Sequence, residues 1–188
     1  MMKRFIKSST LCLLLFILLI MSACSDAEDQ TSQSSTSEGI DEKPAAAVEQ
    51  MPKFHSVDLQ GNEVDESIFA QADITVVNFW GTYCGPCIDE MPDLAEWNQN
   101  LPEGVQIIGI IVDVAGPGER EYQTAKKLIE KTGVNYTNII AGNQFNHVLE
   151  NMVGVPTTFF VDSEGKCLCS EMIGADVEGY KKTVESLR

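Results

Sequence analysis

The sequence predicts an α/β domain in which a central mixed β-sheet is flanked by helices. Two apolar runs, residues 74–80 and 105–112, contain no charged residue and many β-branched ones, which is typical of central strands buried on both faces. Between them, residues 85–100 carry apolar side chains at helical spacing. A strand, a helix and a second strand in this order predict that the two strands are parallel neighbours in the sheet.

Shorter segments complete the predicted domain. They are an N-terminal β-hairpin extension formed by residues 54–59 and the turn at 60–63, helices at 119–131 and 176–187, and a late antiparallel hairpin that joins residues 157–161 to 167–173. Pro92 falls within the helix at 85–100 and is expected to kink it, because proline removes a backbone hydrogen bond.

The first 23 residues have the features of a signal peptide. Three basic residues and no acidic one precede an apolar run at residues 11–20, and the small residues Ser22 and Ala23 follow shortly after it. A retained transmembrane anchor is the alternative, but the run is well short of the roughly 20 residues that cross a bilayer. The mature domain is therefore expected outside the cytoplasm.

Residues 21–24 resemble the lipobox of bacterial lipoproteins, whose cysteine becomes the lipidated first residue of the mature chain. The resemblance implies that residues 1–23 are a lipoprotein signal peptide and that Cys24 anchors the protein to the bacterial cell membrane. Met21 departs from the family pattern, in which leucine is usual, so ordinary secretion after cleavage near Ala23 is the alternative.

Residues 24–50 are predicted to be a disordered tether, and residues 51–188 the folded domain. The tether is rich in Ser, Thr, Gln and acidic residues and has no aromatic residue. Such a segment cannot bury enough apolar surface to offset its conformational entropy.

The charge of the chain argues against nucleic acid as a partner. The whole chain has 13 Lys and Arg against 28 Asp and Glu. Removal of residues 1–23 takes three basic residues and no acidic one, which leaves 10 against 28 and a formal charge near −18. Phosphate backbones and anionic headgroups both repel such a surface, so membrane attachment is expected to rest on the lipid alone.

A CxxC motif, Cys84-Gly85-Pro86-Cys87, follows the strand at 74–80 and opens the helix at 85–100. That context is typical of a redox motif. Cys84 is placed where unsatisfied backbone N–H groups and the positive helix end stabilise a thiolate, the nucleophilic form of cysteine. Cys87, one turn later, is placed to attack the mixed disulfide that Cys84 forms with a substrate.

This motif and two others resemble the thioredoxin superfamily and, within it, the membrane-tethered thiol-disulfide oxidoreductases of the TlpA/ResA type. The resemblance covers about residues 51–187. It rests on residues 78–87, on Glu90-Met91-Pro92 and on Val155-Pro156-Thr157-Thr158. It implies a thioredoxin fold and an enzyme that exchanges disulfides with other proteins, without a cofactor or a metal.

The resemblance also implies roles for single residues. Pro156 matches the cis-proline that packs opposite the CxxC motif and leaves the backbone of Val155 free to pair with a substrate strand; a trans proline is the alternative. Asn78 stands where cytoplasmic thioredoxins have a buried aspartate. Glu90 matches an acid that the ResA-like group places near its cysteines, and we expect it to modulate their protonation. A solvated surface glutamate is the alternative for Glu90.

Two aromatic residues and two cysteines are further candidates. Trp80 and Tyr83 flank the CxxC motif and are assigned to substrate binding, although Trp80 is equally consistent with a core residue. Cys167 and Cys169, at i and i+2 on an expected strand, are predicted to share one face. A disulfide between them would be strained; they could form a second redox relay, bind metal or be small buried side chains.

The predicted function is a reductase of protein disulfides, because Gly-Pro between the cysteines is the dipeptide of thioredoxin. By family resemblance, the electron donor is a membrane thiol transporter of the CcdA or DsbD kind. Candidate acceptors are apocytochromes c, methionine sulfoxide reductases and misoxidised secreted proteins.

Two other functions are compatible with the sequence. One is a zinc- or copper-binding module, since the four cysteines with His55 and His147 supply metal-ligand atoms. The other is a non-enzymatic interaction module that keeps the thioredoxin fold.

Overall fold

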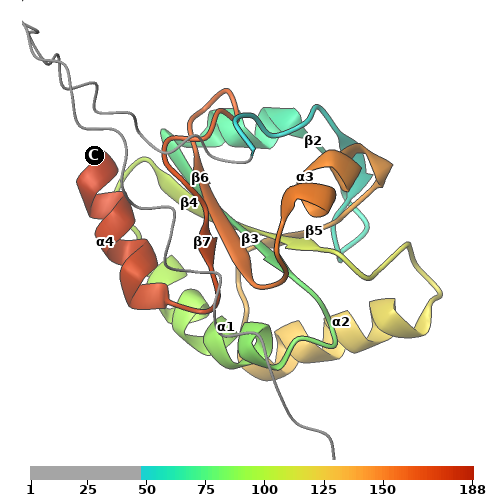
Figure 1. The fold of residues 1–188 in the computed structure, drawn as a ribbon. Coiled ribbons are helices and arrows are strands. Elements are labelled where there is room, and N and C mark those ends of the chain that lie inside the picture. The colour runs from blue at the N-terminus through green and yellow to red at the C-terminus, as the bar shows by residue number, and fades with distance from the viewer. Residues whose placement is uncertain (1–47) are drawn as a thin grey trace, which may run out of the picture. The chain divides into compact units, whose positions relative to one another are not determined.

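A five-stranded mixed β-sheet forms the centre of the fold in the computed structural model, which describes residues 48–188 (Figure 1). The strands lie in the order β5-β4-β3-β6-β7. Their bounds are β3 (Ile74–Trp80), β4 (Val105–Ile111), β5 (Thr137–Ile140), β6 (Thr157–Val161) and β7 (Met172–Ile173). β3, β4 and β5 are parallel, and β6 runs antiparallel to both β3 and β7. The predicted mixed sheet, with β3 and β4 as parallel neighbours, is confirmed.

Helices cover both faces of this sheet (Figure 1). One face packs against α1 (Gly85–Asn98), α2 (Arg120–Thr132) and α4 (Val177–Leu187). The other packs against the 3-10 helices η1 (Glu66–Gln71) and η2 (Asn143–Phe145) and against α3 (Asn146–Asn151). The three predicted helices are confirmed, and α1 continues through Pro92. β5 and α3 were not predicted from the sequence.

The alternation of side chains along β3 determines which residues reach the redox motif. Successive side chains of a strand point to opposite faces. Val77 and Phe79 join the apolar cluster under η1 and α3, whereas Trp80 joins the cluster under α1 and α2. Asn78 therefore points toward the helical layer of α1, and its partner in the antiparallel register with β6 is Thr158. A pair of polar residues is thus carried into the interior beneath α1.

The predicted N-terminal hairpin is confirmed. Its strands are β1 (His55–Val57) and β2 (Glu63–Asp65), which pair in antiparallel register. The carboxylate of Asp58 fixes the turn between them, because it accepts hydrogen bonds from the backbone N–H groups of Gln60 and Asn62.

The packed domain begins before Met51. Val48 is only 2% exposed, and Gln50 forms a β-bridge with Lys166. The carbonyl oxygen of Glu49 also accepts a hydrogen bond from Cys167, so three residues assigned to the tether from sequence contribute to the packing of the domain. Residues 1–47, with the expected signal peptide, Cys24 and the rest of the expected tether, lie outside the described residues.

The late hairpin differs from its prediction. Cys167 bridges to Val161, but the chain leaves the ladder after Leu168 and pairs again only in the two residues of β7. The bend between these contacts breaks the period of two. Cys167 packs into the cluster under η1 and α3, whereas Cys169 packs against the cluster under α1 and α4. The prediction that the two cysteines share one face is therefore wrong.

Candidate active site

The CxxC motif lies at the junction between β3 and α1. Cys84 caps the N-terminus of α1, with its sulfur 3.2 Å from the backbone nitrogen of Cys87. The loop before it is fixed by Asp113, whose carboxylate accepts hydrogen bonds from the N–H group and, at 2.5 Å, the hydroxyl of Thr82. Pro86 lies in the first helical turn, where its missing N–H group breaks no helical bond. The sulfur of Cys84 is thus held at the helix end that stabilises a thiolate.

Cys84 and Cys87 form a disulfide, so the structure shows the oxidised form of the motif. Their Cα atoms are 5.3 Å apart, which is within the usual range for disulfides. Cys84 is 6% exposed and Cys87 only 1%. This difference suits a pair in which Cys84 meets an incoming disulfide and Cys87 acts from the interior.

The segment before β6 lies against the disulfide. The Val155–Pro156 peptide bond is cis, as expected for Pro156. The carbonyl oxygen of Val155 is 3.4 Å from the sulfur of Cys84. The N–H group of Gly174 donates a 2.8 Å hydrogen bond to the carbonyl oxygen of Pro156, which ties this segment to the end of β7. Backbone atoms of Val155 therefore border the sulfur that a substrate would approach.

Glu90 is buried beneath α1 and is only 5% exposed, so the interpretation as a solvated surface glutamate is wrong. Its Oε1 atom accepts a 2.9 Å hydrogen bond from Asn78, and its Oε2 atom lies 3.1 Å from the hydroxyl of Tyr180. Burial raises the pKa of Glu90 to about 7, although both hydrogen bonds act in the opposite direction. A carboxyl group that exchanges protons near neutral pH thus lies one helical turn from Cys87.

The hydrogen bonds of Glu90 with Asn78 and Tyr180 were not predicted from the sequence. Tyr180 lies in α4, 90 residues from Glu90, and its place on the apolar face of that helix gives no sign of where its hydroxyl points. Thr158 accepts a hydrogen bond from Asn78, and the antiparallel pairing of β3 with β6 could have indicated this contact. Tyr136 is also near, since Glu90 adds to the effect of burial in raising its pKa.

The two aromatic candidates differ in position. Trp80 is fully buried, and its indole N–H group donates a 2.8 Å hydrogen bond to Asn138. Trp80 packs in the same apolar cluster as Cys84 and Cys87, so its assignment to substrate contact is corrected to a core residue. Tyr83 is 71% exposed beside Cys84 and remains available to a substrate. Val153 and Ile173, which flank the Val155–Pro156 segment in sequence and in strand pairing, are the other large apolar residues exposed in the described domain.

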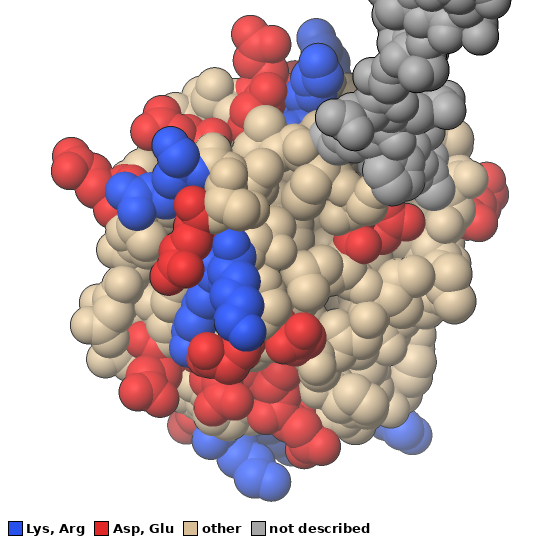
Figure 2. Space-filling view, turned by 60° about the vertical axis from the view of Figure 1, so that its left-hand side comes forward, with Lys and Arg blue, Asp and Glu red and all other residues tan. Residues whose placement is uncertain are grey.

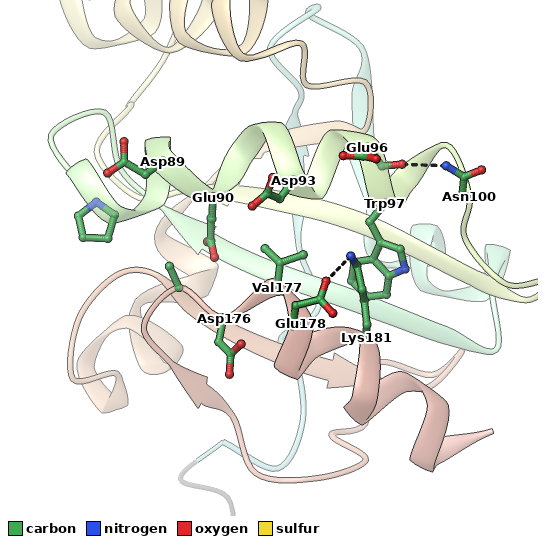
Figure 3. A pocket seen from close by; sticks show the side chains of 12 residues that line it. Asp89, Glu90, Asp93, Glu96, Trp97, Asn100, Asp176, Val177, Glu178 and Lys181 are labelled. Carbon is green, nitrogen blue, oxygen red and sulfur yellow. Dashed lines mark hydrogen bonds and ion pairs between the residues drawn. The ribbon is translucent and has the colours of Figure 1, made fainter.

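A pocket of about 760 Å³ opens between α1 and α4, beside Pro86. Six of its lining residues are acidic, and Lys181 pairs with Glu178 at its edge. Figure 3 shows that the side chain of Glu90 points from α1 toward α4, whereas the side chain of Asp89 points away from α4. On the face turned forward in Figure 2, acidic side chains border a row of basic ones. Glu90 is thus the one buried acid in the lining of this pocket, whose other acidic residues are exposed.

The remaining candidates do not gather around the CxxC motif. Cys167 packs into a different cluster from Cys84 and Cys87, and His55 and His147 are exposed. Within residues 48–188, no three His, Cys, Asp or Glu side chains are grouped in a way that could hold a metal ion. None of the helices in this range has the length and apolar character needed to span a membrane.

The raised pKa of Glu90 predicts a pH-dependent stability. The folded state holds this proton more tightly than the unfolded chain, so the contribution is full below pH 4.5 and is lost as the pH rises to about 7. In chemical denaturation, the wild type should lose on the order of 3 kcal/mol across this window relative to Glu90→Gln. Glu96→Gln, which changes an exposed acid on the same helix, should follow the wild type. Parallel curves for wild type and Glu90→Gln would contradict the assigned pKa.

Comparison with known proteins agrees with this geometry. The AhpC/TSA family model matches residues 47–168. The thiol-disulfide oxidoreductase ResA of Geobacillus thermodenitrificans is 35% identical over 152 residues, which cover 77% of this chain and 82% of that protein. ResA of Geobacillus kaustophilus is 30% identical over 151 residues, with the same shares covered.

A solved structure supports the same assignment. The thioredoxin domain of a thiol-disulfide oxidoreductase from Bacteroides vulgatus superposes with a TM-score of 0.60 at 25% identity, over 77% of this chain and 99% of that one. The thioredoxin fold predicted from sequence is thereby confirmed. The chain belongs to the AhpC/TSA family and, within it, to the ResA-type thiol-disulfide oxidoreductases.

Proposed function

We propose that this oxidoreductase reduces protein disulfides outside the cytoplasm, with Cys84 as the attacking cysteine and Cys87 as the resolving one. The observation that carries the proposal is the position of the Cys84–Cys87 pair at the N-terminus of α1, with the backbone of Val155 only 3.4 Å from the Cys84 sulfur. The difference in burial of the two cysteines supports the order of attack.

In the proposed reaction, the Cys84 thiolate attacks one sulfur of a substrate disulfide. That bond breaks, a mixed disulfide forms, and the second substrate sulfur leaves as a thiolate. The Cys87 thiolate then attacks the Cys84 sulfur, which restores the Cys84–Cys87 disulfide and releases the first substrate sulfur. The substrate gains two electrons and two protons, and the enzyme must be reduced again by a dithiol donor.

Glu90 is the proposed proton acceptor for Cys87. The aspartate of cytoplasmic thioredoxins is replaced here by Asn78, which cannot take a proton but holds Glu90 in place. A group with a pKa of about 7 can accept the Cys87 proton before attack and return a proton to a leaving thiolate.

Substrate binding is proposed to use the edge formed by Val155 and Pro156. Val155 lies beside the Cys84 sulfur, and a substrate backbone that pairs with it would bring its own disulfide to Cys84. The exposed ring of Tyr83 and the side chains of Val153 and Ile173 supply apolar surface around this edge.

The direction and setting of the reaction remain part of the proposal. The Gly85-Pro86 dipeptide favours a reducing potential, which calls for a membrane thiol transporter of the CcdA or DsbD kind as electron donor. Apocytochromes c, methionine sulfoxide reductases and misoxidised secreted proteins are the candidate acceptors. Cys24, as a lipidated residue followed by the tether, would hold the domain at the outer surface of the membrane.

The order of attack can be tested with two serine variants. Cys84→Ser should reduce exchange by at least 10³-fold, on the order of an activated nucleophile's contribution, because no thiolate remains at the helix end. Cys87→Ser should instead accumulate mixed disulfides with its substrates, which non-reducing gels and mass spectrometry would identify. Cys169→Ser is the matched control and should keep wild-type activity. Trapping by Cys84→Ser would reverse the assignment.

The role of Glu90 can be tested by following thiolate absorbance of the reduced protein against pH. An ionised Glu90 disfavours a second negative charge on Cys87, so thiolate should form at lower pH in Glu90→Gln than in the wild type. Disulfide exchange should slow at the same time, because the proton acceptor is lost. Asp89→Asn, an exposed neighbour, should change neither. Superimposable titrations and equal exchange rates would remove Glu90 from the mechanism.

The anchor can be tested by cell fractionation. Cys24→Ser should release the domain from membranes or block its processing, since the lipidated cysteine carries most of the membrane affinity. Cys12→Ser, within the expected signal peptide, is the control and should leave the fractionation unchanged. Membrane retention of a processed Cys24→Ser protein would show that another element anchors the chain.

A further inference from the structure

The hydroxyl of Tyr180 stands between two acceptors. Its oxygen lies 3.1 Å from Oε2 of Glu90 and 2.8 Å from the carbonyl oxygen of Gly174. Tyr180 is fully buried, whereas Gly174 is half-buried. Burial also raises the pKa of Tyr180 to about 12, so the phenol keeps its single proton at any physiological pH.

One proton cannot satisfy both acceptors. A carbonyl oxygen only accepts, and an ionised carboxylate only accepts as well. When Glu90 is ionised, Tyr180 must choose between Glu90 and Gly174. When Glu90 is protonated on Oε2, it donates to the Tyr180 oxygen, and Tyr180 donates to Gly174. Because Asn78 supplies a donor to Oε1 in both states, only the neutral state of Glu90 satisfies every group in this geometry.

Thr158, the other neighbour of the phenol, adds no third acceptor for the Tyr180 proton. A hydrogen bond with Thr158 acts on the phenol as well and lowers the pKa of Tyr180. The oxygen of Thr158 already accepts from Asn78, which leaves the Thr158 proton to donate to the phenol oxygen, so Thr158 does not compete for the Tyr180 proton. A phenol oxygen has room for a second donor, so Thr158 and a protonated Glu90 can both be accommodated.

Gly174 connects this hydroxyl to the cysteines. Its N–H group donates to the carbonyl oxygen of Pro156, and the adjacent carbonyl of Val155 is 3.4 Å from the Cys84 sulfur. We propose that Tyr180 is a positioning residue that links the protonation of Glu90 to the Gly174–Pro156 backbone contact beside Cys84. Loss of the Glu90 proton draws the Tyr180 hydroxyl to the carboxylate and leaves the Gly174 carbonyl without this donor.

This link orders the proton transfers and hydrogen-bond changes of the proposed disulfide exchange. In this respect the inference rests on the proposed function. Transfer of the Cys87 proton to Glu90 returns the Tyr180 hydroxyl to Gly174. Gly174, which bonds to Pro156, then has its hydrogen bond from Tyr180 at the step in which Cys87 attacks the mixed disulfide. Release of the proton from Glu90 removes this hydrogen bond again.

Several other titratable groups face this network. Tyr136 lies near Glu90 and directly precedes β5, and its pKa is raised, so it stays protonated as Glu90 titrates. The oxidised Cys84–Cys87 pair does not titrate. The pocket side of α1 and α4 adds Asp89, Asp93, Glu96, Asp176, Glu178 and Lys181. The acids are exposed and Lys181 is half-buried, so added salt should screen these charges and leave the buried link intact.

The test is an NMR titration of the full-length oxidised chain, in which the side-chain carboxyl carbon of Glu90 and the carbonyl carbon of Gly174 are followed between pH 4 and 9. In the wild type both signals should shift with one common midpoint. In Tyr180→Phe, the Glu90 signal should still titrate, whereas the Gly174 signal should lose that step. Tyr122→Phe is the matched control, because it removes a buried hydroxyl bonded to a carbonyl elsewhere, that of Leu59, and should keep the common step.

Either of two results would overturn the link: a Gly174 signal that stays flat while Glu90 titrates in the wild type, or the same Gly174 step in Tyr180→Phe. Glu90→Gln provides a second variant that does not depend on the folding of Tyr180→Phe. It mimics the neutral acid and should abolish the Gly174 step, so persistence of the step there would also refute the proposal. The titration needs no substrate, so its result is separate from the test of disulfide reduction.

Discussion

The antiparallel register of β3 and β6 is the constraint on which the redox site depends. It sets Asn78 opposite Thr158, and so brings Pro156 to the end of β3 that leads into the CxxC motif. As a result, Val155 and Cys84, which are 71 positions apart, come within 3.4 Å. A slip of one residue would reverse the faces of β6 and turn Thr158 away from Asn78. The contact with the helical layer and the contact with the sulfur therefore depend on the same pairing.

The acidity of Glu90 reflects which donors surround it. Burial favours the neutral form of a carboxyl group, and a neighbouring cation would reverse that preference. Across residues 48–188 the two ion pairs are Arg120–Glu121 and Lys181–Glu178, so neither involves Glu90. Its partners are the amide of Asn78 and the phenol of Tyr180, whose hydrogen bonds offset the cost of burial only in part. The carboxyl group is thereby held near the point at which it can both accept and release a proton.

Most of the fold and the CxxC motif could be predicted from the sequence, because both depend on local patterns. Buried strands, helix periodicity and the CxxC spacing each extend over a few residues, and the motif at Pro156 indicated the opposing backbone. The irregular chain after Cys167 and the short strand β5 were not predicted, since a bend or an edge strand depends on what packs beside it. The contact of Tyr180 was not predicted for a similar reason. The local sequence indicates that Tyr180 lies on the apolar face of a helix, but the direction of its hydroxyl depends on tertiary packing.

Because the acid lies on α1 and not on β3, its spacing from Cys87 is set by local structure, whereas its pKa is set by tertiary structure. Glu90 and Cys87 belong to one helix, so their separation is set by helical geometry and does not depend on how the layers pack. The pKa of Glu90, in contrast, depends on groups from β3 and α4. A change in the packing of α4 therefore alters the acidity of Glu90 while its spacing from Cys87 stays constant. An aspartate at position 78 would lie on the sheet, and both its acidity and its distance from the cysteines would depend on the packing of α1 against β3.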